Sequence, residues 1–476
     1  MTPITKKQYV ISSKELALEG VTEYHLFGRY LYVGDGLKVT QCEAADGKTL
    51  LLLGHAYCMD RAGKSVEEDM AAFCGDDLVA LTQHWTGRFV LMTESMLLTD
   101  ATGLMSAFYR CDGDGYCVSS SLAVIADVLG LSSERSVPNT GLTWQLLPRT
   151  LIPTVRALLC TQRLDFAERS LTVEPIMWMQ DGCSLSTEEK CRTVAKLLEN
   201  GVRNMAQYSG REIMLALTGG KDSRLTMAAL LRAKVPFSAY TAEHDTISGS
   251  DKTVPPQLCK MFDVPHRVIG KGKTDAARVA DYRLFTAQNA NGADAIFYAR
   301  GQYEPLGEAL VLRSGLYEAG QTFGRSIAGG TEKTFAEGLR TYYSEIRANA
   351  EQDHALDEWL ATVRDNPDGF ADIRDRFYVE QRVGGWVAAI EQSLDMNEFV
   401  SIQIANCPAL LSILLSCNEE ERKTLALTYE TMRVLEPQVL EIPVNRRSLG
   451  DRIRYVLHIL RHPVTKFKNF YHKMRG

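Results

Sequence analysis

The sequence predicts an α/β protein in which antiparallel sheets come first, a doubly wound parallel sheet follows, and a helical part ends the chain. Up to about Glu174, short half-alternating apolar runs are separated by Gly and Asp, which is typical of antiparallel strands. From Ser186, amphipathic helices alternate with apolar strands, which is typical of a parallel, doubly wound sheet. Beyond about residue 330 the pattern is largely helical.

The front part of the chain contains five short runs that we predict as strands. These runs are short and apolar, and Gly and Asp separate them, which suggests antiparallel sheets. The runs are Tyr30–Val33, Leu50–Leu53, Phe89–Met92, Met96–Leu98 and Tyr116–Val118. We predict a front domain over residues 1–181.

A second domain is predicted over residues 182–445. It opens with a capping box, Ser186-Thr-Glu-Glu189, and apolar residues then recur at helical spacing. Strands and helices alternate after it, which places ligands at the carboxyl ends of the strands. The predicted order is a strand ending at Thr218, a helix to about Lys234, a strand Phe237–Thr241, a helix ending near Phe262 and a strand His266–Ile269.

Composition points to a soluble globular protein. The 476 residues are 45% apolar and 24% charged, which suits two or three domains. No apolar run reaches the roughly 18 residues of a membrane span, and the N-terminus lacks a signal-peptide pattern, so we expect a cytoplasmic protein. The eleven cysteines show no Cys-x-x-Cys and no zinc-like pairing with His, so we expect reduced, mostly buried thiols.

The last 31 residues form a basic tail. Residues 446–476 hold nine Lys or Arg against Asp451, a charge of +8, so the −6 of the whole chain leaves −14 on the rest. Apolar residues at helical spacing in the tail suit an interfacial helix on anionic lipid or on an acidic saccharide. A helix packed on its own domain is the alternative. Because the body is acidic, we expect no nucleic-acid partner.

The most informative segment is Glu212–Leu225, in which an apolar run leads into Thr-Gly-Gly-Lys-Asp-Ser and then into a helix. Gly219 and Gly220 allow a tight turn and a close approach to a ligand, and the helix start adds N–H groups that bind oxyanions. The Gly-x-x-x-x-Gly-Lys-Ser/Thr of kinases and GTPases is a different pattern. An ordinary strand–turn–helix capped by Asp222 or Ser223 is the alternative.

This segment resembles the pyrophosphatase loop, Ser-Gly-Gly-x-Asp-Ser, of the asparagine synthetase-like ATP-using enzymes. The first hydroxyl, both glycines, the acid and the second serine are all kept. The resemblance implies a PP-loop synthetase domain that binds ATP and Mg²⁺. The nucleotide-binding residues that it implies are Thr218, Gly219, Gly220, Lys221, Asp222, Ser223, Thr241, Ser314 and Gly315.

The front domain is similar to the amidotransferase-type αββα sandwich that precedes the synthetase domain in this family. The similarity rests on Gly87–Met92, Leu98–Gly103, Phe108-Tyr109 and Val118–Ser120, which follow the family's order of strand, Asp–Gly turn, aromatic pair and serine-bearing strand. An unrelated β domain is the alternative.

Glutamine hydrolysis in the family needs an N-terminal cysteine thiolate. Here Thr2 and Pro3 follow Met1, the first cysteine is Cys42, and Leu53–Tyr57 replaces a stretch that would hold glutamine. We therefore expect a degenerate class II amidotransferase-like domain without glutaminase activity, as in the β-lactam synthetase branch. Thr2 as a nucleophile is the alternative.

Further residues follow from the resemblance. Val311–Gly324 is similar to the family's second motif, with one inserted residue, and makes Glu318 the candidate that joins Asp222 in holding Mg²⁺. A surface glutamate on an ordinary helix is the alternative. Pro255-Pro256 lies inside a predicted helix. This pair departs from the family's pattern, and the sequence offers no interpretation of it.

The acceptor pocket and the leaving pyrophosphate have candidates too. The stretch Asp375–Arg382 followed by Gly-Gly-Trp resembles the helix that lines the acceptor pocket, with Tyr378, Glu380 and Arg382 as candidate substrate contacts. Arg446 or Arg447 falls where the family has a lysine that stabilises pyrophosphate. Polar residues of a helix surface and a solvated basic turn are the alternatives.

The resemblance implies an ATP-dependent, AMP-forming ligase that joins a small-molecule carboxylate to an amine. Use of ammonia in place of the amine is one alternative, and a catalytically inactive homologue that binds nucleotide or a partner is another. The identity of both substrates and the oligomeric state, a homodimer included, stay open.

Overall fold

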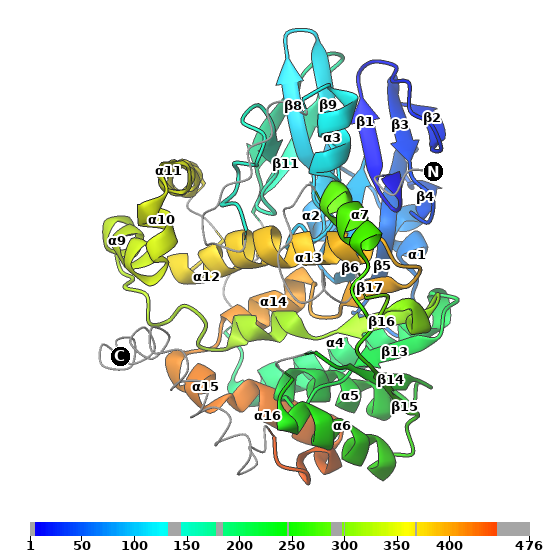
Figure 1. The fold of residues 1–476 in the computed structure, drawn as a ribbon, viewed down its shortest axis with the longest axis vertical. Helices are drawn as coiled ribbons and strands as arrows, with labels where there is room; N and C mark the ends of the chain where they lie inside the picture. The colour runs from blue at the N-terminus through cyan, green and yellow to red at the C-terminus, as the bar shows by residue number, and fades with distance from the viewer. Residues whose placement is uncertain are drawn as a thin grey trace.

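Three sheets organise the chain, two in an upper sandwich and one in a lower domain (Figure 1). The computed structural model describes residues 5–131, 144–177, 184–244, 247–286, 298, 300–366 and 369–444. A long helix, from α12 through α13, crosses between the two parts. Among the described residues, none of the helices has both the length and the apolar character that crossing a membrane requires.

The sandwich is built from two six-stranded antiparallel sheets. The first has the order β10-β8-β9-β1-β3-β2 and the second the order β12-β11-β7-β6-β5-β4. The strands of the first sheet are β1 (Tyr9–Ser12), β2 (Thr22–Leu26), β3 (Arg29–Val33), β8 (Phe108–Asp112), β9 (Gly115–Ser119) and β10 (Arg156–Ala157). Those of the second are β4 (Val39–Glu43), β5 (Thr49–Cys58), β6 (Trp85–Met92), β7 (Met96–Thr99), β11 (Gln162–Phe166) and β12 (Leu171–Pro175).

Side-chain alternation along β5 explains why the second sheet is covered on both faces. Leu51 and Leu53 lie in the core between the two sheets, together with Val90. Leu50 and Leu52 face the other way and join the core shared with the lower domain. Helices α1 (Val66–Ala72) and α4 (Thr187–Tyr208) pack on this outer face, and α3 (Leu122–Val128) packs on the first sheet, which completes four αββα layers.

The lower domain contains a five-stranded parallel sheet in the order β15-β14-β13-β16-β17. Its strands are β13 (Ile213–Ala216), β14 (Ser238–Ala242), β15 (His266–Ile269), β16 (Leu310–Arg313) and β17 (Val400–Gln403). The chain first builds outward from β13 to β15 and then returns to β16 on the other side of β13. The sheet therefore has a topological switch point between β13 and β16, where doubly wound proteins bind ligands.

Helices make up most of the remaining structure. The helices not yet named are α2 (Leu78–Thr82), α5 (Lys221–Ala233), α6 (Gly249–Met261), α7 (Ala276–Thr286), α9 (Glu332–Tyr342), α10 (Ser344–Ala348), α11 (Ala350–Asp365), α12 (Ile373–Phe377), α13 (Ala388–Leu394), α14 (Pro408–Leu415), α15 (Glu419–Thr424) and α16 (Ala426–Leu435). The 3₁₀ segments are η3 (Glu304–Leu306), η4 (Gly315–Gly320) and η6 (Pro437–Leu440), and a π-helical segment, η5 (Tyr378–Val387), joins α12 to α13.

A buried polar contact joins the sandwich to the lower domain. The Asn406 amide donates to the Gly87 carbonyl at 2.7 Å and to the Asp100 carboxylate at 2.8 Å, and it accepts from the Thr102 hydroxyl at 2.8 Å. The Asp100 carboxylate also accepts four backbone N–H groups, one from Phe89 of β6 and three from the turn that follows Asp100. A few residues away, Arg88 of β6 forms a buried ion pair with Asp395.

The fold class predicted from the sequence is confirmed, and all five front strands lie where the short apolar runs predicted them. Helix α4 begins with the predicted capping box, and α6 runs through Pro255 and Pro256 without ending. The prediction that the chain is largely helical beyond residue 330 missed β17, whose four residues are too few to show a strand period. The boundary at residues 181–182 and the tail at 446–476 lie outside the described residues.

We expect Asn406→Ala to lower the free energy of unfolding by about 3 kcal/mol, because three buried hydrogen bonds are lost and a carboxylate loses a donor. Urea unfolding followed by tryptophan fluorescence measures this change. Asn397→Ala is the matched control, since its side chain donates one partly buried bond, to Leu394, and we expect about 1 kcal/mol or less. Equal losses in the two variants would contradict the role of Asn406.

Candidate functional site

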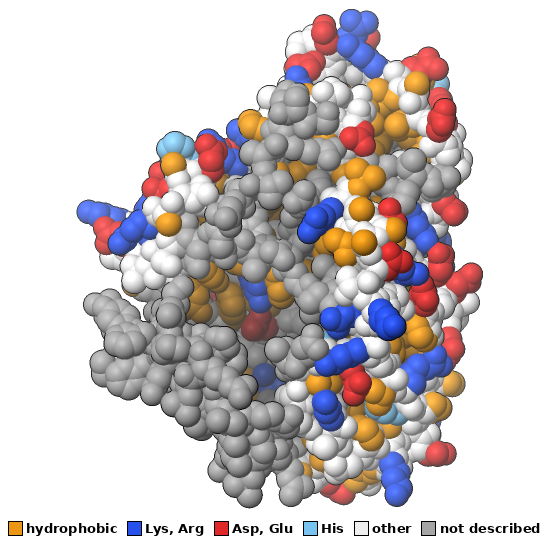
Figure 2. Space-filling view, in the orientation of Figure 1, with side chains coloured by type: hydrophobic (Ala, Val, Ile, Leu, Met, Phe, Trp, Pro, Cys, Tyr) orange, Lys and Arg blue, Asp and Glu red, His pale blue; other side chains and the backbone are white. Residues whose placement is uncertain are grey.

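The candidate site lies at the carboxyl end of β13, beside the switch point of the parallel sheet. Residues 217–220 connect β13 to α5, and Gly220 is the residue that precedes the first turn of α5 without a capping side chain. The loop after β16 and the turn η4 lie on the other side of the switch point. Figure 2 shows a hollow near the centre of its view, with acidic and basic side chains visible in it.

Hydrogen bonds within the loop fix its shape. The Ser223 hydroxyl lies 3.0 Å from both the backbone N and the hydroxyl of Thr218, and the Gly220 N–H donates to the Thr218 hydroxyl at 3.3 Å. Thr218 is exposed, whereas Ser223 is buried. The two hydroxyls that match the family's loop therefore lie together, and Thr218 is open to a ligand.

A carboxylate of the protein already contacts this loop. Asp251, in the first turn of α6, accepts the Gly219 N–H at 2.7 Å through Oδ1 and the Ser248 hydroxyl at 2.8 Å through Oδ2. A side chain on Gly219 would collide with Ser250, since a Cβ there would lie 2.1 Å from its Oγ. Gly219 is thus required by the approach of α6, and its N–H binds an oxyanion supplied by the protein.

Asp222 and Glu318, the two predicted metal ligands, are close enough to interact electrostatically. Burial raises the pKa of Asp222, while the Lys221 ammonium and a 2.9 Å hydrogen bond from Gln321 act in the opposite direction. Burial also raises the pKa of Glu318; Arg382 counteracts this rise, and the charge of Asp222 adds to it. Two half-buried carboxylates that repel one another form an environment that favours a cation.

The donor chemistry suits Mg²⁺. Among the described residues, no group of three or more His, Cys, Asp or Glu could hold a metal, which excludes an all-protein cage in that part of the chain. Magnesium needs only one or two carboxylates when water and phosphate supply the other ligands. Asp222 and Glu318 are therefore the residues that would hold the ion.

Tyr378 and Arg382 of the π-helical segment belong to the same electrostatic group. Burial raises the pKa of Tyr378 well above its ordinary value, and the charges of Glu318 and Asp222 add to this. The guanidinium of Arg382 lies 3.6 Å from the centre of the Trp386 ring and is one of the charges that act on Glu318. π-Helical segments are rare in proteins, and those that occur often lie at functional sites.

Two predicted residues, Glu380 and Thr241, have side chains engaged in the surrounding structure. Glu380 is 1% exposed, and its carboxylate accepts hydrogen bonds from Thr161, Trp359 and Arg376 of the surrounding structure. The Thr241 hydroxyl, also buried, donates to the Leu217 carbonyl at 2.9 Å.

Polar groups of the turn after β16 are likewise hydrogen-bonded to other parts of the protein. Ser314 shares a 2.8 Å hydrogen bond with Thr226 of α5, and the Gly315 N–H donates to Gln403 of β17 at 2.9 Å. Gly315 itself is exposed at this edge. A ligand that used these donors would have to displace Gln403 or share it.

Arg224 holds the end of the described chain against the loop. Its fully buried guanidinium donates to the carbonyls of Val439 and Ile442 and to that of Gly219, and burial lowers its pKa to about 10. Ile442 precedes Arg446 by four residues. Arg446 and Arg447, the predicted pyrophosphate contacts, lie outside the described residues.

Asp251 and Gln321 contribute to the site but were not predicted from the sequence. The position of Asp251 at the site could have been predicted from the sequence, because Asp251 follows β14 and the loops after parallel strands meet at one end of the sheet. The position of Gln321 could not have been predicted, because its 2.9 Å hydrogen bond to Asp222 spans 99 residues and depends on the fold.

A group of basic side chains surrounds His55 of the front domain. His55, of the stretch Leu53–Tyr57, lies near Lys38, Arg211, Lys7 and Arg88. Desolvation, followed by these positive charges, lowers the pKa of His55 to about 3. Most of the described cysteines are buried free thiols, and Thr2 lies outside the described residues.

The fold and the site define a two-part α/β protein: an antiparallel αββα sandwich followed by a parallel-sheet domain with a candidate phosphate loop at its switch point. Neither a family model nor a curated protein matches the chain. Solved structures give distant similarities to synthetases and to an amidotransferase.

Three of these structures illustrate the range. Glutamine-dependent NAD⁺ synthetase from Acinetobacter baumannii, in complex with ADP, is 14% identical over 38% of this chain and 37% of its own, with a TM-score of 0.21. NMN synthetase from Francisella tularensis is 13% identical over 42% and 95%, with a TM-score of 0.21. Glutamine phosphoribosylpyrophosphate amidotransferase from B. subtilis is 12% identical over 65% and 70%, with a TM-score of 0.23. At TM-scores this low, the likeness says nothing about activity.

We expect Asp251→Ala to bind ATP several-fold more tightly than the wild type, because the Gly219 N–H no longer has a carboxylate to displace and a negative charge beside the phosphates is removed. Calorimetric titration with a non-hydrolysable ATP analogue and Mg²⁺ measures the affinity. Glu308→Ala, which removes an exposed acid just before β16 at the opposite edge of the sheet, is the control and should leave the affinity unchanged. Weaker binding by Asp251→Ala would mean that Asp251 supports the ligand.

We expect the protein to lose stability as the pH falls from about 6.5 towards 3, the window between the ordinary and lowered pKa of His55. In that window the unfolded chain binds a proton that folded His55 does not, so stability rises with pH. His55→Gln should show a flatter pH dependence in urea unfolding. His25→Gln, at an exposed position of β2, is the control, and an identical slope in wild type and His55→Gln would refute the assignment.

Proposed function

We propose that this chain is an ATP-dependent carbon–nitrogen ligase that adenylates a small-molecule carboxylate and passes it to an amine, releasing AMP and pyrophosphate. The proposal rests mainly on one observation: Thr218, Ser223 and the paired glycines lie at the switch point of a parallel sheet, beside the interacting carboxylates Asp222 and Glu318.

The chemistry explains why such a site is needed. A carboxylate resists attack by an amine, because its carbonyl carbon is electron-rich and its leaving group would be an oxide. Attack of the carboxylate oxygen on the α-phosphorus of ATP gives an acyl adenylate and pyrophosphate. The amine then attacks the acyl carbon, loses a proton and displaces AMP, which leaves an amide.

The residues of this chain would bind charge and position the reactants. The Thr218 hydroxyl and the N–H groups of the loop would donate to the pyrophosphate, and Ser223 would hold Thr218 in place. Lys221 and Arg382 would supply positive charge near the phosphates. A magnesium ion held by Asp222 and Glu318 would supply further charge neutralisation when bound. Preorganised donors, with no covalent nucleophile, suffice for such a reaction.

Tyr378 and the arginines of the tail have smaller parts in this proposal. Tyr378 lies among the charged groups of the site, and its raised pKa keeps the hydroxyl protonated, so that it can donate a hydrogen bond. Arg446 or Arg447 would bind the departing pyrophosphate. We propose that Glu380 supports the π-helical segment, because its two carboxylate oxygens already accept hydrogen bonds from three donors.

A second candidate function is that of an inactive homologue that binds nucleotide or a partner. The observation that favours it is the internal saturation of the loop, since Asp251 and Gln403 occupy the N–H groups of Gly219 and Gly315. The two candidates differ in whether pyrophosphate exchanges into ATP. They are therefore separable by one assay.

We expect exchange of labelled pyrophosphate into ATP when the cognate acid is present in a screen of small carboxylates, and a loss of about 100-fold or more in Asp222→Asn and Ser223→Ala. Asp263→Asn, a surface acid before β15, is the control and should retain exchange. Exchange that persists unchanged in Asp222→Asn would remove Asp222 from the site. Release of AMP with ammonia alone would identify ammonia as the nitrogen donor.

A further inference from the structure

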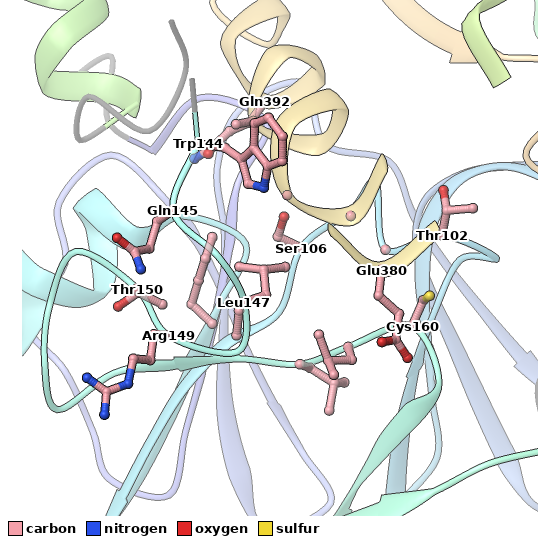
Figure 3. Close-up of a pocket in the computed structure, with 18 residues that line it drawn as sticks. Thr102, Ser106, Trp144, Gln145, Leu147, Arg149, Thr150, Cys160, Glu380 and Gln392 are labelled. Atoms are coloured by element: carbon pink, nitrogen blue, oxygen red, sulfur yellow. The ribbon is translucent and has the colours of Figure 1, made fainter. Parts of the chain in front are cut away.

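A cavity separate from the nucleotide loop lies between the sandwich and the long helix that crosses beneath it. It encloses about 600 Å³ of space, its opening to solvent included. Figure 3 shows Glu380 and Cys160 together on one side of it, and Gln145, Thr150 and Arg149 on the opposite side. Neither Asp222 nor Glu318 lines this cavity.

Two buried donors on the wall of the cavity have no hydrogen-bond partner. Trp144 is 6% exposed and Gln392 is 2% exposed, and neither the indole Nε1 nor the amide Nε2 has an acceptor within the described structure. A buried N–H without an acceptor costs about 1 to 3 kcal/mol, so such groups are rarely left without one. Because both residues line the same cavity, a ligand there would supply the missing acceptors.

The charges on the wall are already balanced. Glu380 pairs with Arg376, and Arg149 pairs with Glu351 and Glu358. The Cys160 thiol stays neutral, because burial and the charge of Glu380 raise its pKa well above the ordinary value. The described wall therefore offers no unbalanced charge to an ion, and a charged ligand would lose its hydration without compensation.

The rest of the wall is mainly apolar. Phe108, Leu147, Leu158 and Leu159 contribute side chains to it. A ligand that filled the cavity would bury apolar surface against these residues, which is the main favourable term in binding small uncharged molecules. The wall thus selects an apolar body with one or two acceptor oxygens.

Glycines of the π-helical segment keep the cavity and Trp144 in their present form. A Cβ on Gly385 would lie 2.7 Å from Cδ1 of Trp144, and one on Gly384 would lie 3.1 Å from the Thr102 carbonyl oxygen. Any larger residue at position 385 would push the indole out of place. The helix can approach the front domain only with glycine at this position.

We infer that this cavity is a binding site for a small uncharged molecule with an apolar body and a carbonyl-type oxygen, which accepts hydrogen bonds from Trp144 and Gln392. The site is distinct from the nucleotide loop and does not depend on the proposed ligase activity. Its binding can therefore be measured without ATP, magnesium or turnover.

Cyclohexanone is a suitable probe, because it joins an apolar ring to one carbonyl acceptor and carries no charge. Ligand-observed NMR titration of the full chain gives its dissociation constant, and crystals soaked with it show where it lies. Cyclohexylammonium and cyclohexanecarboxylate have the same ring with a positive and a negative charge. We expect saturable binding of the ketone and at least tenfold weaker binding of both ions.

Trp144→Phe and Gln392→Leu each remove one donor while keeping most of the side-chain volume, and each should weaken ketone binding about tenfold. Trp386→Phe is the matched control. The indole Nε1 of Trp386 is also buried without a partner in the described structure, but Trp386 does not line the cavity. The affinity of the Trp386→Phe protein for the ketone should therefore stay within twofold of wild type. Circular dichroism confirms folding of each variant, and Trp144→Phe alone suffices if Gln392→Leu does not fold.

Density for the ketone in the cavity, together with the loss in both donor variants and none in the control, would support the inference. Ordered water alone in the soaked crystals, binding at crystal concentration only, equal affinity in all variants, or tighter binding of either ion would overturn it.

Discussion

The structure depends on a buried polar contact between its two parts. Asn406, which follows the last strand of the parallel sheet, inserts its amide between the Gly87 carbonyl and the Asp100 carboxylate of the sandwich. A buried carboxylate is costly unless its oxygens accept hydrogen bonds, and here they accept from backbone N–H groups of β6 and of the following turn and from the Asn406 amide. Separation of the two parts would expose this network and the apolar core around it, so we expect them to unfold together.

A second set of contacts with the front domain anchors the long helix. Asp395, just after α13, pairs with Arg88 and accepts from Gln8, while Lys7 donates to the carbonyls of residues 397 and 399. The helix is thereby anchored to the front domain at its C-terminal end. Its π-helical segment then presents Tyr378 and Arg382 to the carboxylates near the loop. A front domain without glutaminase activity would still have this structural role.

The sequence predicted the parts of the protein that depend on local pattern. The strand β13, its glycine turn and helix α5 were predictable because the period of apolar residues and the turn chemistry lie within fourteen residues. Contacts across hundreds of residues were not. The bond between Asn406 and Asp100 spans 306 residues, and the engagement of Glu380 by Thr161 spans 219. The family resemblance named Tyr378 and Glu380 together, but Tyr378 lies among the charges of Asp222 and Glu318, whereas Glu380 accepts hydrogen bonds from Thr161, Trp359 and Arg376.

The hydrogen bonds that the loop already makes determine what a nucleotide would have to displace in order to bind. A phosphate that took the Gly219 N–H would have to move Asp251, which is held in turn by the Ser248 hydroxyl at the start of α6. The displaced carboxylate would stay close to the phosphates, and its repulsion would favour a cation near Asp222 and Glu318. Nucleotide and metal would therefore bind cooperatively, since each offsets a charge that the other leaves uncompensated. In this structure the Asp251 carboxylate accepts the Gly219 N–H and thereby helps to hold the loop in its shape.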